Sequence, residues 1–423
     1  MRIVQVMHWF LPRHLAGTEV YTYNLSAELS KRHEVYIYCR EDGFFHEEFR
    51  ETDEVYKGLP VRRVYFNLIG RKAHLVNKSL IRFKNRVIEE SFERFLDQIN
   101  PYVVHFQHLF KLSASLIPAT KRKGIPVVVT LHDYWFICHN TQLLRPNLEV
   151  CSGPAFGLKC AGCAELDLSG WARALLNPLI TPLFIYRAFH MKDCLEKADL
   201  IIAPSEFLKE KFVEHGFTEG KILVSDNGTN AKLFNNCDRK LSKRLRFGYI
   251  GTIQRHKGLH VLIEAFNKID DPRAELKVFG DPRVDPDYYA EVQQMVRNPR
   301  IQFPGEFDNS EIGRVLAGID VLVVPSIWPE NSPVTIHEAY LAKVPVIASN
   351  LGGMPSLVRD GITGLLFEAG NADDLRAKMS LLLEDHSLIE RFRGNIGPVK
   401  TMEENARELE EIYLNLIAAK CPS

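Results

Sequence analysis

The stretch that decides the fold is Asp320-Val321-Leu322-Val323-Val324, followed by Pro325-Ser326-Ile327-Trp328-Pro329-Glu330-Asn331-Ser332-Pro333-Val334-Thr335-Ile336-His337-Glu338-Ala339. The residues after Asp320 form a continuous apolar run of the kind that a buried parallel strand needs. Ser332 is suited to cap a helix and Pro333 to open its first turn. Glu330 is therefore expected in the loop at the carboxyl end of the strand, and Glu338 in the second turn of the helix.

Short apolar runs alternate with amphipathic stretches along the chain, which is the pattern of a parallel sheet with helices on both faces. Strands are expected at residues 2–7, 34–39, 102–106, 126–131 and 199–203, and helices at 18–31, 74–99, 113–121 and 206–215. The pattern restarts at 245–251 and continues with strands at 275–279, 300–303, 320–324, 345–348 and 364–367. Two successive series predict an α/β protein with two Rossmann-like, doubly wound parallel-sheet domains.

The domain boundary is expected near the polar segment 235–244, which reads as a connector. The first domain would comprise residues 1–235 and the second residues 236–397. A last helix at about 401–416 follows Gly397-Pro398, and residues 398–423 are expected to complete the first domain.

Composition indicates a soluble globular protein, with 46% hydrophobic and 25% charged residues in 423. The formal net charge of zero gives no reason to expect a nucleic-acid partner. The apolar stretch 171–191 is broken by Arg173, Pro178, Pro182 and Arg187, so a membrane span is not expected. Eight cysteines without a recognisable secretory signal favour a reducing, cytoplasmic setting.

The segment from Pro325 to Ala339 resembles the Glu-x7-Glu signature of retaining nucleotide-sugar glycosyltransferases, glycosyltransferase family 4. The resemblance implies a GT-B fold, in which two Rossmann-like domains face a central cleft and the last helix crosses back to the first domain. It also implies that Glu338 holds the ribose hydroxyls of the donor nucleotide and that Glu330 contacts the transferred sugar. Ser332 and Val334, between the two glutamates, belong to the same donor-binding set.

The loop Gly251-Thr252-Ile253-Gln254-Arg255-His256-Lys257-Gly258 follows an expected strand. A glycine there lets backbone N–H groups approach a phosphate, and Lys257 supplies a point charge. In the family this loop usually reads Gly-Arg, four residues, Lys-Gly, and both basic groups hold the diphosphate. Lys257 matches, whereas Thr252 stands where arginine is usual, so Arg255 is the candidate to replace that contact.

Two further loops carry glycines at the ends of expected strands. Gly352 and Gly353 precede a short helix and resemble the family's Gly-Gly-x-Pro-Glu, with Ser356 in place of the glutamate. Gly17, after Ala16 and before a helix, resembles the family loop that faces the donor phosphates. In both places an ordinary structural turn is the alternative.

His132 and Asp133 follow the expected strand at 126–131 and resemble the His-Asp motif of the family. The resemblance implies that the histidine region contacts the donor sugar near the reacting carbon. The alternative is a buried histidine hydrogen-bonded to a loop.

Four cysteines, Cys138, Cys151, Cys160 and Cys163, fall within the glycine-rich segment 136–169, and the last two form Cys-x-x-Cys. A loop of this length without secondary structure is uncommon in a compact domain, so a staple is expected. Four thiolates could bind structural zinc tetrahedrally. An iron–sulfur cluster and disulfides are the alternatives.

Residues 71–86 carry six lysines and arginines among apolar residues, and the apolar stretch 171–191 is a second amphipathic candidate. A basic amphipathic helix can lie on an anionic membrane, and related enzymes often use lipid-linked acceptors. Peripheral association with the inner face of the cell membrane is therefore one expectation. Packing of both stretches within the first domain is the other.

The resemblance as a whole implies a retaining transferase that moves a sugar from a UDP-, GDP- or ADP-sugar to a glycan or lipid-linked acceptor. Synthesis of cell-surface polysaccharide or lipopolysaccharide is the expected role. Glu330, His132 and Lys257 are the expected catalytic residues, and the chemistry would need no metal. A nucleotide-sugar epimerase, a phosphorylase and a noncatalytic nucleotide-sugar-binding protein on the same fold remain as alternatives.

Overall fold

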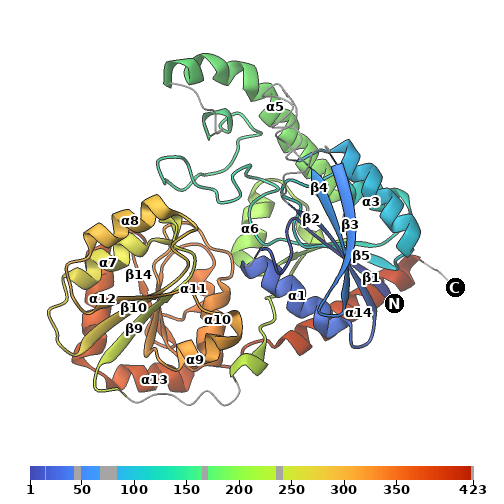
Figure 1. Ribbon diagram of the computed structural model, residues 1–423. Coiled ribbons are helices and arrows are strands. Elements are labelled where there is room, and N and C mark those ends of the chain that lie inside the picture. Colours follow the sequence, from blue (N-terminus) through green and yellow to red (C-terminus); the bar gives the residue numbers. More distant parts are fainter. Residues whose placement is uncertain (15, 42–48, 67–82, 164–169, 235–241, 421–423) are drawn as a thin grey trace. The chain divides into compact units, whose positions relative to one another are not determined.

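The computed structural model describes residues 1–14, 16–41, 49–66, 83–163, 170–234 and 242–420, with only the backbone described at 170–176. The chain divides into two compact units (Figure 1). The first comprises Met1–Gly228 together with Met402–Ser423, and the second comprises Thr229–Thr401.

The first unit is built on an eight-stranded sheet in the order β3-β4-β2-β1-β5-β6-β7-β8. Neighbouring strands are parallel except for the β3–β4 hairpin, and the strand order reverses direction between β1 and β5. The strands are β1 (Arg2–Met7), β2 (Glu34–Glu41), β3 (Phe49–Tyr56), β4 (Leu59–Phe66), β5 (Val103–Phe106), β6 (Val127–Thr130), β7 (Leu200–Ala203) and β8 (Ile222–Val224). The helices are α1 (Gly17–Leu29), α3 (Arg86–Ile99), α4 (Leu116–Arg122), α5 (Gly170–Glu196), α6 (Glu206–Glu214) and α14 (Met402–Lys420).

The second unit has a six-stranded parallel sheet in the order β11-β10-β9-β12-β13-β14, which reverses direction between β9 and β12. The strands are β9 (Leu245–Ile250), β10 (Ala274–Phe279), β11 (Ile301–Gly305), β12 (Val321–Val324), β13 (Val346–Ser349) and β14 (Gly364–Phe367). The helices are α7 (Leu259–Asn267), α8 (Pro286–Met295), α9 (Ile312–Leu316), α10 (Val334–Leu341), α11 (Met354–Leu357), α12 (Ala372–Glu384) and α13 (Ser387–Asn395).

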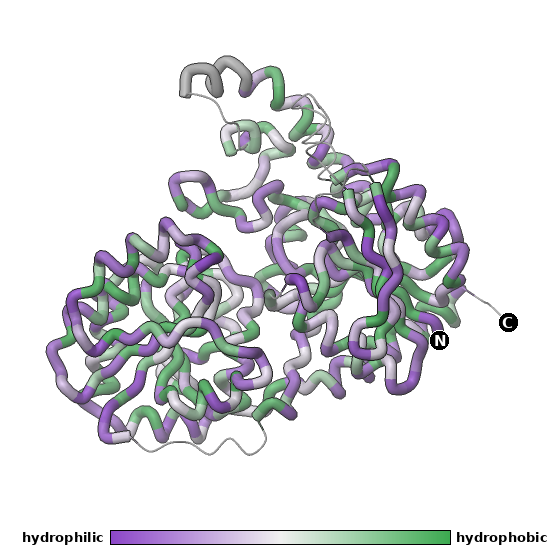
Figure 2. The backbone as a smooth tube through the Cα atoms, viewed as in Figure 1, coloured by the Kyte–Doolittle hydropathy of each residue, from purple (hydrophilic) through white to green (hydrophobic). Residues whose placement is uncertain are grey.

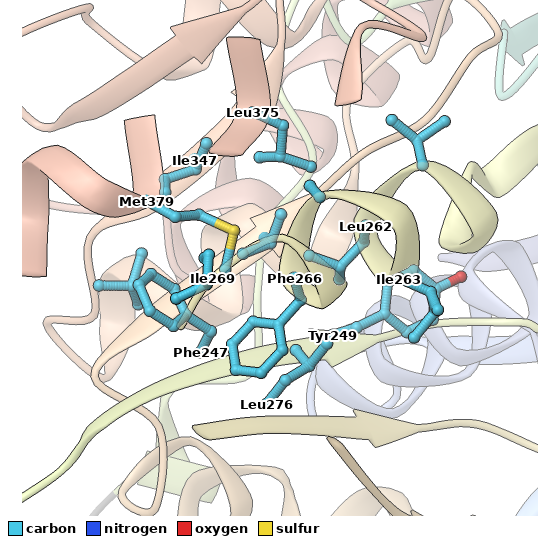
Figure 3. Packing of buried hydrophobic residues seen from close by; sticks show 14 of the residues in the cluster. Phe247, Tyr249, Leu262, Ile263, Phe266, Ile269, Leu276, Ile347, Leu375 and Met379 are labelled. Carbon is cyan, nitrogen blue, oxygen red and sulfur yellow. The ribbon is translucent and has the colours of Figure 1, made fainter. Parts of the chain in front are cut away.

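Buried apolar side chains hold the helices to the sheet of the second unit. Phe247 of β9 and Leu276 of β10 pack with Phe266 of α7 and Met379 of α12 in one core cluster (Figure 3). Figure 2 shows the central strands of both units as mainly hydrophobic, with much of the hydrophilic colour in the surrounding segments. Burying one such side chain contributes about 1.5–3 kcal/mol, so the apolar runs explain why these segments form the sheets.

The predicted architecture of two Rossmann-like units is confirmed, and each predicted strand is found within about two residues of its expected bounds. Neither β8 nor the β3–β4 hairpin is among the strands expected from the sequence. In β3 charged residues interrupt the apolar pattern, because this edge strand is only partly covered.

The start of two expected helices differs from the prediction. Asn85 caps α3 by accepting hydrogen bonds from the N–H groups of Val87 and Ile88, so α3 begins at Arg86, and residues 74–82 of the expected helix lie outside the described residues. The helix expected from residue 113 begins at Leu116. Residues 67–82 and 235–241, which include most of the basic stretch 71–86 and of the connector 235–244, lie outside the described residues.

The last helix, α14, packs against α1 in the first unit, as predicted. Leu409 and Tyr413 of α14 are buried in the core of that unit, and the Tyr413 hydroxyl lies 2.6 Å from Nδ1 of the buried His105. The Tyr21 hydroxyl of α1 donates to Oδ1 of Asn405, at 2.9 Å. None of the helices in the described part of the chain is long and apolar enough to cross a membrane.

Shortening a buried side chain of α14 is expected to destabilise the first unit. Leu409→Ala should lower its free energy of unfolding by about 2–5 kcal/mol, because the substitution leaves a cavity between α14 and the sheet. Urea unfolding followed by tryptophan fluorescence measures this, since three of the four tryptophans lie in the first unit. Leu414→Ala, at a half-exposed position of the same helix, is the matched control and should change stability by less than about 0.5 kcal/mol.

Candidate active site

The carboxyl ends of three neighbouring strands, β9, β12 and β13, carry the residues that the sequence assigns to donor binding. In open α/β sheets ligands bind at this edge, at the point where the strand order reverses. That point lies between β9 and β12 in the second unit. The loop of Lys257 follows β9 and the loop of Glu330 follows β12, so the two adjoin the expected ligand position.

Lys257 and Glu330 form an ion pair, with 2.7 Å between Nζ and Oε1. The Ser326 hydroxyl donates to the same carboxylate oxygen, also at 2.7 Å. Burial raises the pKa of Glu330, but the charge of Lys257 and the hydrogen bonds from Lys257 and Ser326 outweigh it, and the pKa is lowered overall. Glu330 is therefore a buried but ionised carboxylate. Nζ of Lys257 also lies 5.1 Å from the centre of the Trp328 ring.

Two glycines bring the loops around Glu330 into backbone contact. Gly258 has a φ of 71°, and a Cβ there would overlap the carbonyl of Pro325. Gly352 has a φ of 67°, and its Cβ would overlap the backbone of Glu330. The N–H of Gly353 donates to the carbonyl of Glu330, at 2.6 Å. Gly352 and Gly353 therefore hold the backbone of Glu330 in place. The sequence predicted only that these two glycines let the backbone approach a ligand.

Helix α10 carries Glu338, which is buried. Burial raises the pKa of this carboxyl to about 8, so in the free protein it is largely protonated at neutral pH. Among the described residues, no salt bridge reaches its carboxylate. A buried carboxyl without a cation suits a ligand that brings hydroxyl donors.

The start of α10 differs from the prediction. Ser332 was expected to cap the helix, but the helix begins at Val334 with Pro333 in the cap position. The Ser332 hydroxyl instead lies 2.8 Å from Nε2 of His337. The prediction assigned the cap one residue too early because Pro333 keeps extended backbone angles here and does not join the first turn.

The loop 251–258 places Gly251 and Thr252 directly after β9, and the Thr252 carbonyl accepts a hydrogen bond from the Tyr249 hydroxyl at 2.8 Å. The Arg255 guanidinium is paired with Glu291 of α8 and lies 4.9 Å from the centre of the Tyr288 ring. Arg255 is therefore held against α8. To take the place of the arginine that the family usually has at the position of Thr252, its guanidinium would have to leave Glu291.

In the first unit, His132 follows β6 and its Nε2 lies 2.9 Å from Oε1 of Gln107, after β5. Burial and the nearby His108 lower the pKa of His132 to about 3. The imidazole is therefore neutral at physiological pH. It can donate or accept a hydrogen bond but carries no charge to offer a phosphate.

The sequence analysis did not identify a histidine–carboxylate cluster beside His132. Nε2 of His108 lies 2.9 Å from Oδ2 of Asp133, and the His8 and His108 rings are 4.3 Å apart. Nε2 of His8 lies 3.7 Å from the buried carboxylate of Glu19. The signal was available, because His8 and His108 follow β1 and β5 as His132 follows β6.

Gly17 is the first residue of α1 and is exposed. Ala16 in the cap position makes no side-chain hydrogen bond, so the first N–H groups of the helix are not capped by it. Such a helix start can face an anion. The buried Glu19 in the first turn adds a carboxyl whose pKa is raised by burial.

The four cysteines line one small cavity of about 20 Å³, together with His139. Their sulfurs do not surround a common metal position. In the described part of the chain, no group of three or more His, Cys, Asp or Glu side chains is arranged to hold a metal ion. The expected zinc geometry is therefore not formed, and no disulfide joins the four cysteines.

Comparisons with known proteins agree with this architecture. The family model described as Glycosyltransferase Family 4 matches residues 15–233, about half of the chain, and the one described as Glycosyl transferases group 1 matches residues 236–397. An uncharacterized glycosyltransferase of Methanocaldococcus jannaschii is 28% identical over 53% of this chain and 58% of its own length. The sulfoquinovosyl transferase of Arabidopsis thaliana is 27% identical over 44% of this chain and 38% of its own. The chain thus spans about half the length of these two relatives.

A longer match is an uncharacterized 42.6 kDa protein in the cps region of Klebsiella pneumoniae, 23% identical over 85% of this chain and 88% of that protein. Among solved structures, sucrose-phosphate synthase of Thermosynechococcus elongatus superposes with a TM-score of 0.70 at 20% identity, covering 99% of both chains. HepE of Anabaena, solved with UDP and glucose, gives 0.65 at 18% identity over 97% and 98% of the two chains. These likenesses confirm the predicted GT-B fold. With a family model matched over about half of its length and this fold, the chain belongs to glycosyltransferase family 4.

Proposed function

We propose that this protein is a retaining glycosyltransferase that moves a sugar from a nucleoside-diphosphate sugar to a glycan or lipid-linked acceptor. The Lys257–Glu330 ion pair at the reversal point of the second sheet is the observation that carries the proposal. It sets a fixed cation and a fixed carboxylate side by side, and α10, which follows the same loop, carries a buried carboxyl with a raised pKa. A diphosphate and a hydroxyl-rich sugar or ribose complement these groups.

Lys257 would stabilise the leaving diphosphate. Glycosyl transfer passes through an oxocarbenium-like state, and negative charge grows on the leaving group as the bond to the sugar breaks. A cation that is already held in place by Glu330 needs little reorganisation to meet that charge. The start of α7, whose cap residue is Gly258, adds backbone N–H groups after the same loop.

Glu330 and His132 would act on the sugar. Glu330 is ionised and fixed by Ser326, so it can accept hydrogen bonds from sugar hydroxyls. His132 is neutral, so it can hydrogen-bond a hydroxyl or the acceptor. For retention of configuration we propose front-face attack, in which the leaving phosphate takes the proton of the acceptor hydroxyl.

A role in cell-surface polysaccharide or lipopolysaccharide synthesis is part of the proposal. The relative in the cps region of Klebsiella pneumoniae, matched over most of both chains, supports it. UDP in the HepE structure supports a uridine donor as the first to test among UDP-, GDP- and ADP-sugars.

Removing the charge of Lys257 should abolish most transfer while donor binding persists. Lys257→Ala and Glu330→Gln should each lower kcat by about 10²–10³-fold, because each removes a group that interacts with the transition state. Product formation from a panel of nucleotide sugars and candidate acceptors, followed by mass spectrometry, measures the loss. Lys268→Ala is the matched control, since Lys268 forms surface ion pairs with Glu264 and Asp373 away from the site.

Three outcomes would overturn this proposal. Wild-type rates in Lys257→Ala and Glu330→Gln would reject the site. Conversion of the donor sugar without an acceptor would indicate an epimerase. Donor binding without transfer or hydrolysis across the panel would indicate a noncatalytic binding protein, to which the missing arginine at Thr252 would then be relevant.

Nucleotide binding should release a proton through Glu338. With a pKa of about 8, roughly 0.9 of these carboxyls are protonated at pH 7. Ribose hydroxyls donate to the charged form and lower its pKa, so binding expels the proton and affinity rises with pH up to about 8. Calorimetry with UDP in buffers of different ionisation enthalpy counts the proton.

Glu338→Gln should remove this proton release, because its amide does not titrate. Glu330→Gln is the matched comparison and should leave the release unchanged, since the pKa of Glu330 is already lowered in the free protein. Equal proton release in wild type and Glu338→Gln would contradict the assignment of Glu338 to the ribose.

Peripheral membrane association is also part of the proposal, and it is supported by the outer face of α5. Leu179 and Phe189 of this helix are 73% and 60% exposed, and Phe189 stacks on the exposed Phe156. Lys84 lies beside Tyr186 on the same face, and its Nζ donates to the tyrosine hydroxyl at 2.8 Å. Exposed apolar groups flanked by lysine suit an interface with anionic lipid.

Introducing negative charge on this face should weaken lipid binding. The double variant Leu179→Glu/Phe189→Glu should bind vesicles containing anionic lipid at least about tenfold more weakly, because each glutamate opposes both burial and charge attraction. Sedimentation with vesicles of neutral and anionic composition measures this. Leu381→Glu/Leu414→Glu, at exposed leucines elsewhere, is the control, and equal binding of both double variants would contradict the proposed surface.

A further inference from the structure

We infer that Cys138, Cys151, Cys160 and Cys163 bind a metal centre through four thiolates, either one zinc ion or an iron–sulfur cluster. The four side chains come from a segment with little regular structure, yet they line one cavity. Of the six cysteines whose state the structure describes, Cys39 and Cys194 lie in separate places. Four cysteines converge here, and all four belong to this segment.

Backbone N–H donors and one buried guanidinium lie around the sulfurs. The N–H of Gly153 donates to Sγ of Cys151, at 3.4 Å, and backbone hydrogen bonds from Asn140 and Leu143 reach Cys138. The buried guanidinium of Arg187 on α5 interacts electrostatically with Cys138 and Cys160. These groups are placed to interact with negative sulfur once a metal has displaced the thiol protons.

The backbone of the segment is held in conformations that need an external restraint. Five non-glycine residues between Cys138 and Cys163 have positive φ: Thr141 (65°), Leu143 (51°), Leu148 (67°), Ala155 (45°) and Phe156 (55°). Such residues persist only where the surroundings over-determine them. One apolar cluster contains Ala161, Ile180 and Phe184, with Cys160 packed against it, and Leu143 and Leu144 of the segment are buried as well. A four-coordinate centre would add a further restraint.

The sulfurs must move inward to close on one ion, because as they stand no three such ligands are arranged to hold one. The segment can follow, since a short 3-10 turn at Ala161–Cys163 is its only helical element among the described residues. An iron–sulfur cluster is larger than one ion and would need less closure. In either case the thiols lose their protons to solvent when they bind.

The centre would act as a structural support for the His132–Asp133 turn. The N–H of Tyr134 donates to the carbonyl of Thr141 at 3.0 Å, and the N–H of Cys138 donates to the carbonyl of Tyr134. Nε2 of His139 lies 3.3 Å from the carbonyl of Cys163. The cysteine segment is thus bonded to the residues that directly follow the candidate active-site histidine.

Metal analysis of the full-length protein, purified without oxygen or chelator, tests the inference. We expect about one zinc per chain, or iron with an equal amount of acid-labile sulfide and absorbance near 400 nm, and these two results separate the two centres. The double variant Cys160→Ser/Cys163→Ser should lose at least about 90% of the metal. Cys194→Ala, at a buried cysteine outside the segment, is the matched control and should keep it.

Counting reactive thiols in the wild-type protein gives a second test that does not require the variant to fold. In wild-type protein a chelator should make about four further thiols reactive and lower the unfolding temperature, while UDP affinity stays unchanged because its proposed site is in the second unit. Absence of zinc and iron from anaerobic wild-type protein would overturn the inference. So would disulfides among the four cysteines in mass spectrometry, or metal retained by Cys160→Ser/Cys163→Ser.

Discussion

The second unit depends on one buried ion pair, Arg246 with Asp320. The guanidinium contacts both carboxylate oxygens, with Nε 2.9 Å from Oδ2 and Nη2 3.0 Å from Oδ1, and the Arg246 N–H also donates to Oδ2. The pair joins the amino ends of β9 and β12, where the strand order reverses. A buried pair of this kind contributes little net stability, but a shifted register would leave both charges unpaired. We interpret it as the contact that fixes the register of these two strands, in which Phe247 lies opposite Val321.

Register at one end of the strands decides the geometry at the other. The four residues of β12 rise about 13 Å. Because the strand is short, the register that is set at Asp320 also fixes the position of Pro325 at its other end. There Gly258 and Gly352 bring the neighbouring loops against Pro325 and Glu330. The Lys257–Glu330 distance therefore follows from a chain of short, rigid contacts, which is what a preorganised site requires.

The sequence predicted the parts of this arrangement that follow from local pattern. Apolar runs located the strands, and position after a strand located Lys257, Glu330 and His132. The partner of Arg255 could not be predicted, because Glu291 comes from another element, the helix α8. The hydrogen bond from Ser326 to Glu330 forms within one loop, but residue spacing does not show which side chains of a loop meet. The start of α10 was placed too early for a different reason, since Pro333 keeps extended backbone angles and Ser332, outside the helix, contacts His337 instead of capping it.

The spacing of the two glutamates also could not show that their pKa values shift in opposite directions. Both are buried, yet Lys257 and Ser326 keep Glu330 ionised, whereas the pKa of Glu338 rises to about 8 because burial acts on it without compensation. Environments that separate the pKa values of two carboxyls give them different roles. Glu330 is ionised in the free protein, which suits the proposed task of orienting a sugar. Glu338 is largely protonated in the free protein at neutral pH, and under the proposed function a ligand that supplies hydroxyl donors would favour its charged form.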